Sequence, residues 1–179
     1  MIRIIDENIE RVPMIQSETL SEEFWDKLHK EHQNLLRLAQ DKELGTECAR
    51  VFSLGMEKQG RDYIGSPGEN RVLVENFDIP HIIIHNHADG ATISLEDFDS
   101  FLRRPNTFSI QAVSNGGPVH LLEKLPHYNA VDAIRKYINA LEEISILLDA
   151  EKTQDEVEGV VEEFLKSLTE DGFAYGRWV

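Results

Sequence analysis

The sequence predicts an α/β or α+β domain in which helices flank a central β-sheet. Three observations predict this class: helical apolar spacing near the N-terminus, β-branched runs between turn residues in the middle, and helical spacing again in the last third. Elements in this order are expected to pack as layers around one core. The 179 residues, 41% of them hydrophobic and 28% charged, are enough to bury such a core.

The N-terminal part of the chain predicts one long helix. The first 18 residues contain two short apolar clusters, which indicate a short strand or an extended arm. Thr19 and Glu22 have the spacing of a capping box. Apolar residues then recur on one helix face, at Phe24, Leu28, Leu35 and Ala39. We therefore expect a helix that begins after Thr19 and ends near Lys42, before Gly45.

The middle of the chain predicts the sheet. Strands are expected at residues 47–55 and 71–77, with turns at Gly60 and Gly65 between them. The run IPHIIIHNH at 79–87 is typical of a strand that is buried on both faces. A short helix follows at 95–104, with Leu95, Phe98 and Leu102 inward and Pro105 after its end. Strands at 107–114 and 118–124 flank Asn115-Gly116-Gly117, which predicts a hairpin.

The last third of the chain predicts helices. Residues 129–179 are expected to form a C-terminal helical extension that packs on the main domain, residues 1–128. One helix face has the a/d-like spacing of a heptad, at Val131, Ile134, Ile138, Leu141 and Leu148. A second face contains Val157, Val161, Phe164 and Leu168. These faces are expected to lie in the core or in a dimer seam.

Charge and cysteine content restrict the classes of partner. The chain has 18 basic and 33 acidic residues, so its net charge is −15. Such a chain is repelled by a phosphate backbone or an anionic bilayer, so neither nucleic acid nor a membrane is expected as a partner. Cys48 is the single cysteine, and no apolar run is long enough for a signal peptide or a membrane span. A cytoplasmic location is therefore expected.

One constellation of side chains predicts chemistry. His85 and His87 lie one residue apart on a predicted strand, so their side chains point to the same face. Asp97 follows across a glycine-containing loop, in the first turn of the next helix. Two histidines and one carboxylate leave a fourth coordination position for water, which is the composition of a catalytic zinc site. The sequence therefore predicts Zn²⁺ bound by His85, His87 and Asp97.

These residues resemble the motif of the JAB/JAMM (MPN) metallopeptidase family, His-x-His followed by Ser94-x-x-Asp97. The resemblance covers roughly residues 45–125 and is closest to bacterial and prophage JAB-like and RadC-like domains. It implies a JAMM/cytidine-deaminase-like central mixed β-sheet flanked by helices, with the C-terminal helices added. Two positions depart from the family pattern. Ala88 replaces the usual proline, and six residues separate His87 from Ser94 where most members have seven.

The resemblance also implies an activity and a role for each site residue. Family members are zinc metallopeptidases or isopeptidases that hydrolyse an amide bond, often beside a ubiquitin-like or sulfur-carrier-like tail. The family's glutamate, which accepts a proton from the zinc-bound water, corresponds by position to Glu47, with Glu57 and Glu75 as alternatives. Ser94 would donate a hydrogen bond to the oxyanion.

Three other interpretations of these residues remain open. The chain could be a catalytically inactive JAMM-like binding or assembly module of prophage or toxin-system origin. It could be a metal-dependent nuclease or phosphoesterase, although such enzymes usually have more carboxylate ligands and often a second metal. Ser94 and Asp97 also have the spacing of a helix capping box, which is a purely structural role.

Overall fold

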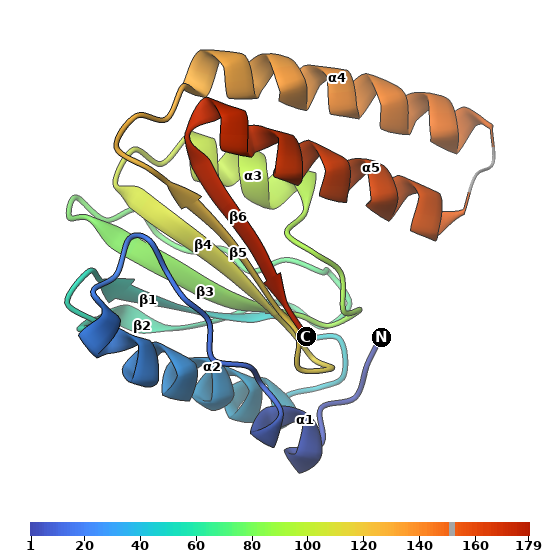
Figure 1. The fold of residues 1–179 in the computed structure, drawn as a ribbon. Helices are drawn as coiled ribbons and strands as arrows, with labels where there is room; N and C mark the ends of the chain where they lie inside the picture. Colours follow the sequence, from blue (N-terminus) through green and yellow to red (C-terminus); the bar gives the residue numbers. More distant parts are fainter. Residues whose placement is uncertain (151–152) are drawn as a thin grey trace.

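Within residues 1–150 and 153–179, which this computed structural model describes, the chain forms a six-stranded sheet with helices on both faces (Figure 1). The strand order is β2-β1-β3-β4-β5-β6. Strands β3 and β4 run parallel and the other neighbouring pairs run antiparallel. The predicted α/β class is therefore confirmed as a mixed sheet flanked by helices. The strands are β1 (Cys48–Ser53), β2 (Lys58–Ile64), β3 (His81–His87), β4 (Thr107–Ser114), β5 (Val119–Lys124) and β6 (Phe173–Trp178).

Helix α2 (Trp25–Gln40) covers one face of the sheet and confirms the predicted N-terminal helix. A 3₁₀ turn, η1 (Glu22–Phe24), precedes it. The predicted capping box is wrong, because the Thr19 hydroxyl donates instead to Oε1 of Glu123, at 2.6 Å. The Glu123 carboxylate in β5 is fully buried and needs such donors. Within the predicted N-terminal arm or strand, Asp6–Glu10 forms the short helix α1.

The prediction for β3 is confirmed and two neighbouring predictions are wrong. Every residue of β3 is buried, between β1 and β4. Among the described residues, 71–77 have no strand partner, although they were predicted as a strand. Instead of pairing with a strand, this segment packs three apolar side chains against the sheet beside Tyr63. They are Val72, Val74 and Phe77. Gly60 is not a turn residue but lies within β2 at a φ of +64°, where the register with β1 shifts.

The opposite face of the sheet is covered by three helices that follow the predicted order. These are α3 (Leu95–Leu102), α4 (Ala130–Asp149) and α5 (Gln154–Ser167) (Figure 1). The prediction of helix to the end of the chain missed β6, which follows the 3₁₀ turn η2 (Leu168–Asp171) and pairs with β5. Residues 151 and 152 of the predicted extension lie outside the described part of the chain.

The predicted face of α4 does not lie in the core. Its residues Val131, Ile134, Ile138, Leu141 and Leu148 are between 42% and 61% exposed. The helix packs on the domain through another side, which contains Ala133, Tyr137, Ala140 and Ile144. The predicted face of α5 is partly confirmed, because Val161, Phe164 and Leu168 are buried. Across the described parts of the chain, no helix combines the length and the apolar content needed to span a membrane.

We expect the buried His32 to make stability depend on pH. Its Nε2 lies 2.6 Å from Oε1 of Gln111, and its Nδ1 has no hydrogen-bond partner among the described residues. Burial lowers the pKa of His32 to about 4, with a smaller lowering from His29 and an opposing effect of Gln111. The unfolded chain binds a proton here below about pH 6.5, whereas the folded chain does not. The free energy of unfolding should therefore fall by about 2 kcal/mol from this group between pH 6.5 and 4.5.

Urea unfolding at several pH values, on the wild type and on His32→Gln, measures this effect. The variant cannot take up the proton, so its free energy of unfolding should depend less steeply on pH in this range. Burial also lowers the pKa of His120 to about 4, so a smaller pH dependence should persist in the variant. Identical slopes for the two proteins would show that His32 does not titrate as described.

Candidate metal centre

Strand β3 places two histidines side by side on one face of the sheet. His85 and His87 are both buried, and residues one apart on a strand share a face. The cross-strand neighbours of His85 are Ala49 in β1 and Ala112 in β4. Their small side chains leave room for the imidazole ring. The backbone at His85 is held between β1 and β4, and the backbone at His87 is paired with Ser114 of β4.

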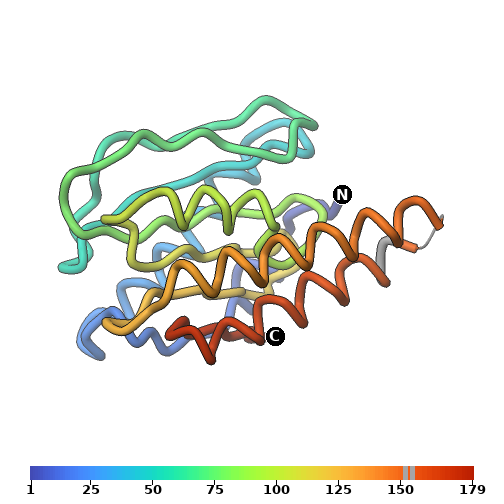
Figure 2. The backbone as a smooth tube through the Cα atoms, turned by 90° about the horizontal axis from the view of Figure 1, so that it is seen from above, coloured from blue at the N-terminus to red at the C-terminus, as the bar shows by residue number. Residues whose placement is uncertain are grey.

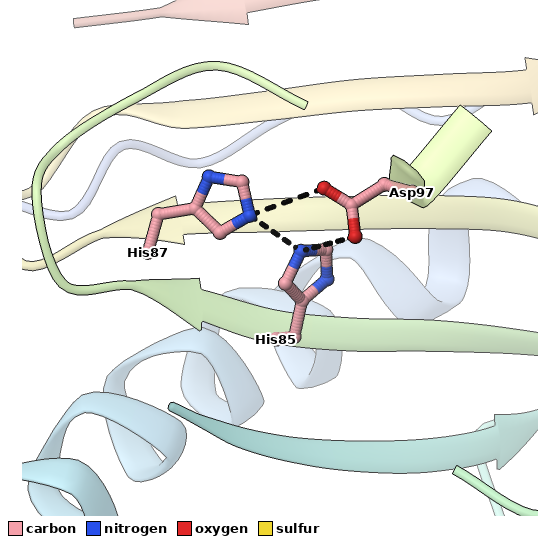
Figure 3. Close-up of side chains that lie close together, drawn as sticks. All are labelled: His85, His87 and Asp97. Carbon is pink, nitrogen blue, oxygen red and sulfur yellow. Dashed lines mark hydrogen bonds and ion pairs between the residues drawn. The ribbon is translucent and has the colours of Figure 1, made fainter. Parts of the chain in front are cut away.

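Helix α3 brings Asp97 to these histidines (Figure 3). Nε2 of His85 lies 2.8 Å from Nε2 of His87 and 3.5 Å from Oδ1 of Asp97. Nε2 of His87 lies 3.2 Å from Oδ2 of Asp97. Tetrahedral zinc with ligands at 2.0–2.1 Å holds neighbouring ligand atoms ~3.3 Å apart. The spacing of these three side chains therefore fits one metal ion, and the predicted ligands do come together.

Hydrogen bonds from other groups orient the candidate ligands. Nδ1 of His87 lies 3.1 Å from the carbonyl oxygen of Ala91, to which it donates when it carries the proton. This leaves Nε2 with a free lone pair for a metal, which is the usual arrangement of metal-binding histidines. Oδ2 of Asp97 accepts hydrogen bonds from the backbone N–H and the hydroxyl of Ser94, at 2.9 and 2.6 Å. Oδ1 of Asp97 lies on the side of His85, 3.5 Å from its Nε2.

Ser94 is the N-cap of α3. Its hydroxyl oxygen accepts a hydrogen bond from the backbone N–H of Asp97 at 3.0 Å, and its own backbone N–H donates to Oδ2 of Asp97 at 2.9 Å. This reciprocal pair is a capping box, so the structural role suggested by the spacing is confirmed. The role of Ser94 as a donor to an oxyanion stays a prediction. The cap has a direct consequence for the site, because it fixes the first turn that carries Asp97.

Glu47 lies beside the three candidate ligands, immediately before β1. It is buried and lines a cleft of about 210 Å³ together with His85, Ser94 and Asp97. Burial raises the pKa of Glu47; the neighbouring His87 and His85 oppose this, and the negative charges of Asp97 and Asp89 add to it. A buried carboxylate with a raised pKa is a suitable proton acceptor.

The two alternative glutamates lie elsewhere. Glu57 is exposed in the turn that follows β1. Glu75 is exposed on the extended segment after β2 and accepts a hydrogen bond from the Tyr63 hydroxyl at 2.5 Å. Neither lines the cleft that contains His85 and Asp97. The geometry therefore favours Glu47 over both alternatives.

The candidate ligands carry opposite charges in the metal-free protein. Burial lowers the pKa of His87, but the hydrogen bond and charge of Asp97, with the charge of Glu47, raise it to about 9. Burial raises the pKa of Asp97, but His85 and His87 together hold it well below its usual range. At neutral pH, Asp97 is thus an anion and His87 a cation. A metal that binds here must displace the proton of His87.

Asn86, between the two histidines, has a structural role that the sequence analysis did not assign. Its side chain is fully buried on the other face of β3, where Oδ1 accepts from the backbone N–H of Cys48 at 2.7 Å. Its Nδ2 donates to Oδ1 of Asn115 at 2.9 Å. Asn86 thus ties β3 to the residue after Glu47 and to the β4–β5 turn. A buried amide in a central strand must be hydrogen-bonded, which is the sequence signal that could have indicated this role.

A second group of polar side chains supports the loop between the ligands. The Thr92 hydroxyl lies 3.1 Å from Nδ1 of His120 in β5 and 3.2 Å from the hydroxyl of Tyr175 in β6. The loop that runs from His87 to Ser94 is therefore attached to the far edge of the sheet. The sequence gives no signal for this group, because its members are distant in the chain and belong to an unpredicted strand.

No protein-family model, curated protein or solved structure matches this chain. The resemblance to the JAB/JAMM family therefore rests on the motif residues alone.

Proposed function

We propose that this protein is a zinc-dependent hydrolase of amide bonds. The observation that carries the proposal is the convergence of two imidazole nitrogens and one carboxylate from β3 and α3, next to the buried Glu47. Three protein ligands leave one position for water, as in catalytic zinc sites. The choice of an amide as the bond that is cleaved comes from the resemblance of the motif to JAMM metallopeptidases.

Each residue has a defined task in this proposal. His85, His87 and Asp97 hold the metal, which when bound supplies an activated water at neutral pH. Glu47 would take up a proton from the attacking water and deliver it to the leaving amine. Ser94 caps the first turn of α3. Its hydroxyl would donate to the oxyanion after it gives up its hydrogen bond to Asp97. Asn86 holds the segment before β1 against β3 and so positions Glu47.

The proposed substrate is a peptide or protein tail, with a ubiquitin-like or sulfur-carrier-like tail as the class that the family resemblance suggests. One wall of the cleft is formed by residues 70–74, which are not paired in the sheet. Such a wall suits an extended tail better than a folded surface. We propose a cytoplasmic location, because the chain has one cysteine and no pair to form an internal disulfide.

Metal analysis tests the proposal directly. We expect the wild type, purified without chelator and supplied with zinc at neutral pH, to hold about one zinc ion per chain. The double variant His85→Ala/His87→Ala should hold none, because two of its ligands are gone. His127→Ala removes an exposed histidine that lies outside the site and should bind zinc as the wild type does. A wild type that takes up no zinc would refute the metal site and the hydrolase together.

One observation favours a second function, that of an inactive binding or assembly module. The hydroxyl of Ser94 already donates to Asp97 and caps α3, so it is not free to bind an oxyanion in this arrangement. A zinc-loaded protein that binds a peptide tail but cleaves no amide would support this alternative. Cleavage that depends on zinc would support the hydrolase.

A further inference from the structure

Helix α4 has an apolar stripe that the described part of the chain leaves uncovered. The stripe contains Val131, Ile134, Ile138, Leu141 and Leu148, each between 42% and 61% exposed. The helix already packs on the domain through a different side, centred on the buried Ala133 and Ala140. Figure 1 shows α4 as the outermost helix on its side of the sheet, and Figure 2 shows it running beside α5 when seen from above. The stripe therefore faces outward.

The spacing of the stripe is that of a helix that packs lengthwise on another helix. With Val131 at position a, the stripe residues alternate between a and d positions of consecutive heptads, and Ser145 occupies the remaining a position. A surface helix needs one apolar face to hold it on its own domain. Because α4 already has such a face, the stripe is not needed to hold the helix on its own domain. It extends ~26 Å along the helix, at 1.5 Å per residue.

We propose that α4 forms a dimer interface with a second copy of this chain, with the two α4 helices antiparallel. A two-fold axis between Ile138 and Leu141 pairs every a position with a d position of the other copy. Ile138 then packs on the partner's Leu141, and Val131 on the partner's Leu148. The small polar Ser145 meets the partner's Ile134, a combination that disfavours shifted registers. An interface in which one patch meets itself about a two-fold axis is the commonest form of dimer.

Charges beside the stripe favour a second copy in this orientation. Arg135 and Glu142 both occupy the e position that flanks the stripe. In the antiparallel pair, Arg135 lies next to the partner's Glu142. The two-fold axis repeats this contact between the partner's Arg135 and Glu142. Arg135 has a side chain that is 73% exposed and contacts Asp132 on its own helix, so it can reach across the seam. Elsewhere a net charge of −15 per chain makes two copies repel each other, which limits association to such complementary surfaces.

Substitution of a central stripe residue tests the interface. The wild type should sediment at twice the chain mass of 20.5 kDa at micromolar concentration. Ile138→Glu places two carboxylates in the centre of the seam and should give the monomer. Ile146→Glu is the matched control: Ile146 is 67% exposed on the same helix but lies outside the a and d positions, so this variant should stay dimeric. Circular dichroism establishes that both variants are folded.

Charge reversal tests the orientation. Arg135→Glu and Glu142→Arg should each weaken the dimer by about tenfold, because each places like charges together twice. The double variant should regain most of the lost affinity. A wild-type monomer at these concentrations, or an Ile138→Glu dimer as stable as the wild type, would overturn the interface. Failure of the double variant to regain affinity would overturn the antiparallel register. Neither result depends on zinc or on hydrolysis.

Discussion

Glu47→Gln should lower the rate of zinc-dependent amide hydrolysis by about 10²–10⁴-fold, which is the usual contribution of a general base. Glutamine has the shape of glutamate but cannot accept a proton. Because Glu47 is not among the candidate ligands, the variant should still bind about one zinc ion per chain. The expected result is therefore a loaded protein without activity. The rate can be measured on peptide amides and on isopeptide-linked conjugates that the wild type cleaves.

Two matched variants serve as controls for Glu47. Glu57→Gln and Glu75→Gln change the same chemical group at exposed positions outside the cleft, and both should keep the wild-type rate. A second measurement needs no substrate. In cobalt-substituted protein, the pH at which the visible spectrum changes reports the ionisation of the metal-bound water, and Glu47→Gln should shift it. A Glu47→Gln variant with the wild-type rate and spectrum would assign the proton acceptor to another residue.

Phe98→Ala should lower the free energy of unfolding by about 3–5 kcal/mol, the range for loss of a buried phenylalanine. Phe98 follows Asp97 directly in α3 and is fully buried. Its ring centroid lies 4.8 Å from that of Phe164 in α5, 5.5 Å from that of Tyr137 in α4, and 6.2 Å from that of Phe173 in β6. One side chain thus joins α3 to three other elements. Its removal should leave a cavity that these elements cannot close together.

Urea unfolding of the metal-free protein measures this loss without a contribution from bound zinc. Phe98→Leu keeps most of the apolar volume and should cost much less than Phe98→Ala. Phe77→Ala, which truncates a partly buried phenylalanine in another apolar cluster, should also cost less. If Phe98→Ala lost no more free energy than Phe77→Ala, the packing of α3 would not depend on this ring.

Local signals in the sequence predicted the elements that carry the metal centre. The β-branched run before His85, the capping pattern at Ser94 and the hairpin at Asn115-Gly116-Gly117 each act within a few residues, so the sequence alone reveals them. Residues 71–77 alternate as a strand does, but whether such a segment finds a strand partner depends on the rest of the sheet. Strand β6 was missed for the same reason, since its pairing partner β5 lies about 50 residues earlier.

In the candidate site too, residues set by local sequence could be predicted, and contacts between distant parts of the chain could not. The two histidines and Asp97 could be predicted, because strand alternation and the helix start fix their directions. Glu47 could be placed only through the family resemblance, since 33 acidic residues offer many candidates. The hydrogen bonds of Asn86 and Thr92 join parts of the chain that are far apart in sequence. Such contacts exist only once the sheet has formed, and no local pattern encodes them.

The central position of β3 determines how the metal would relate to folding. His85 pairs with both β1 and β4, His87 pairs with β4, and the capping box sets Asp97 without a metal. A metal bound here would therefore occupy a preformed site, unlike the zinc of small zinc fingers, which organises the chain around itself. Little of the free energy of metal binding would be used to organise the chain. The protein would keep its shape with or without a metal, so under the proposed function the metal supply would set how many molecules are active.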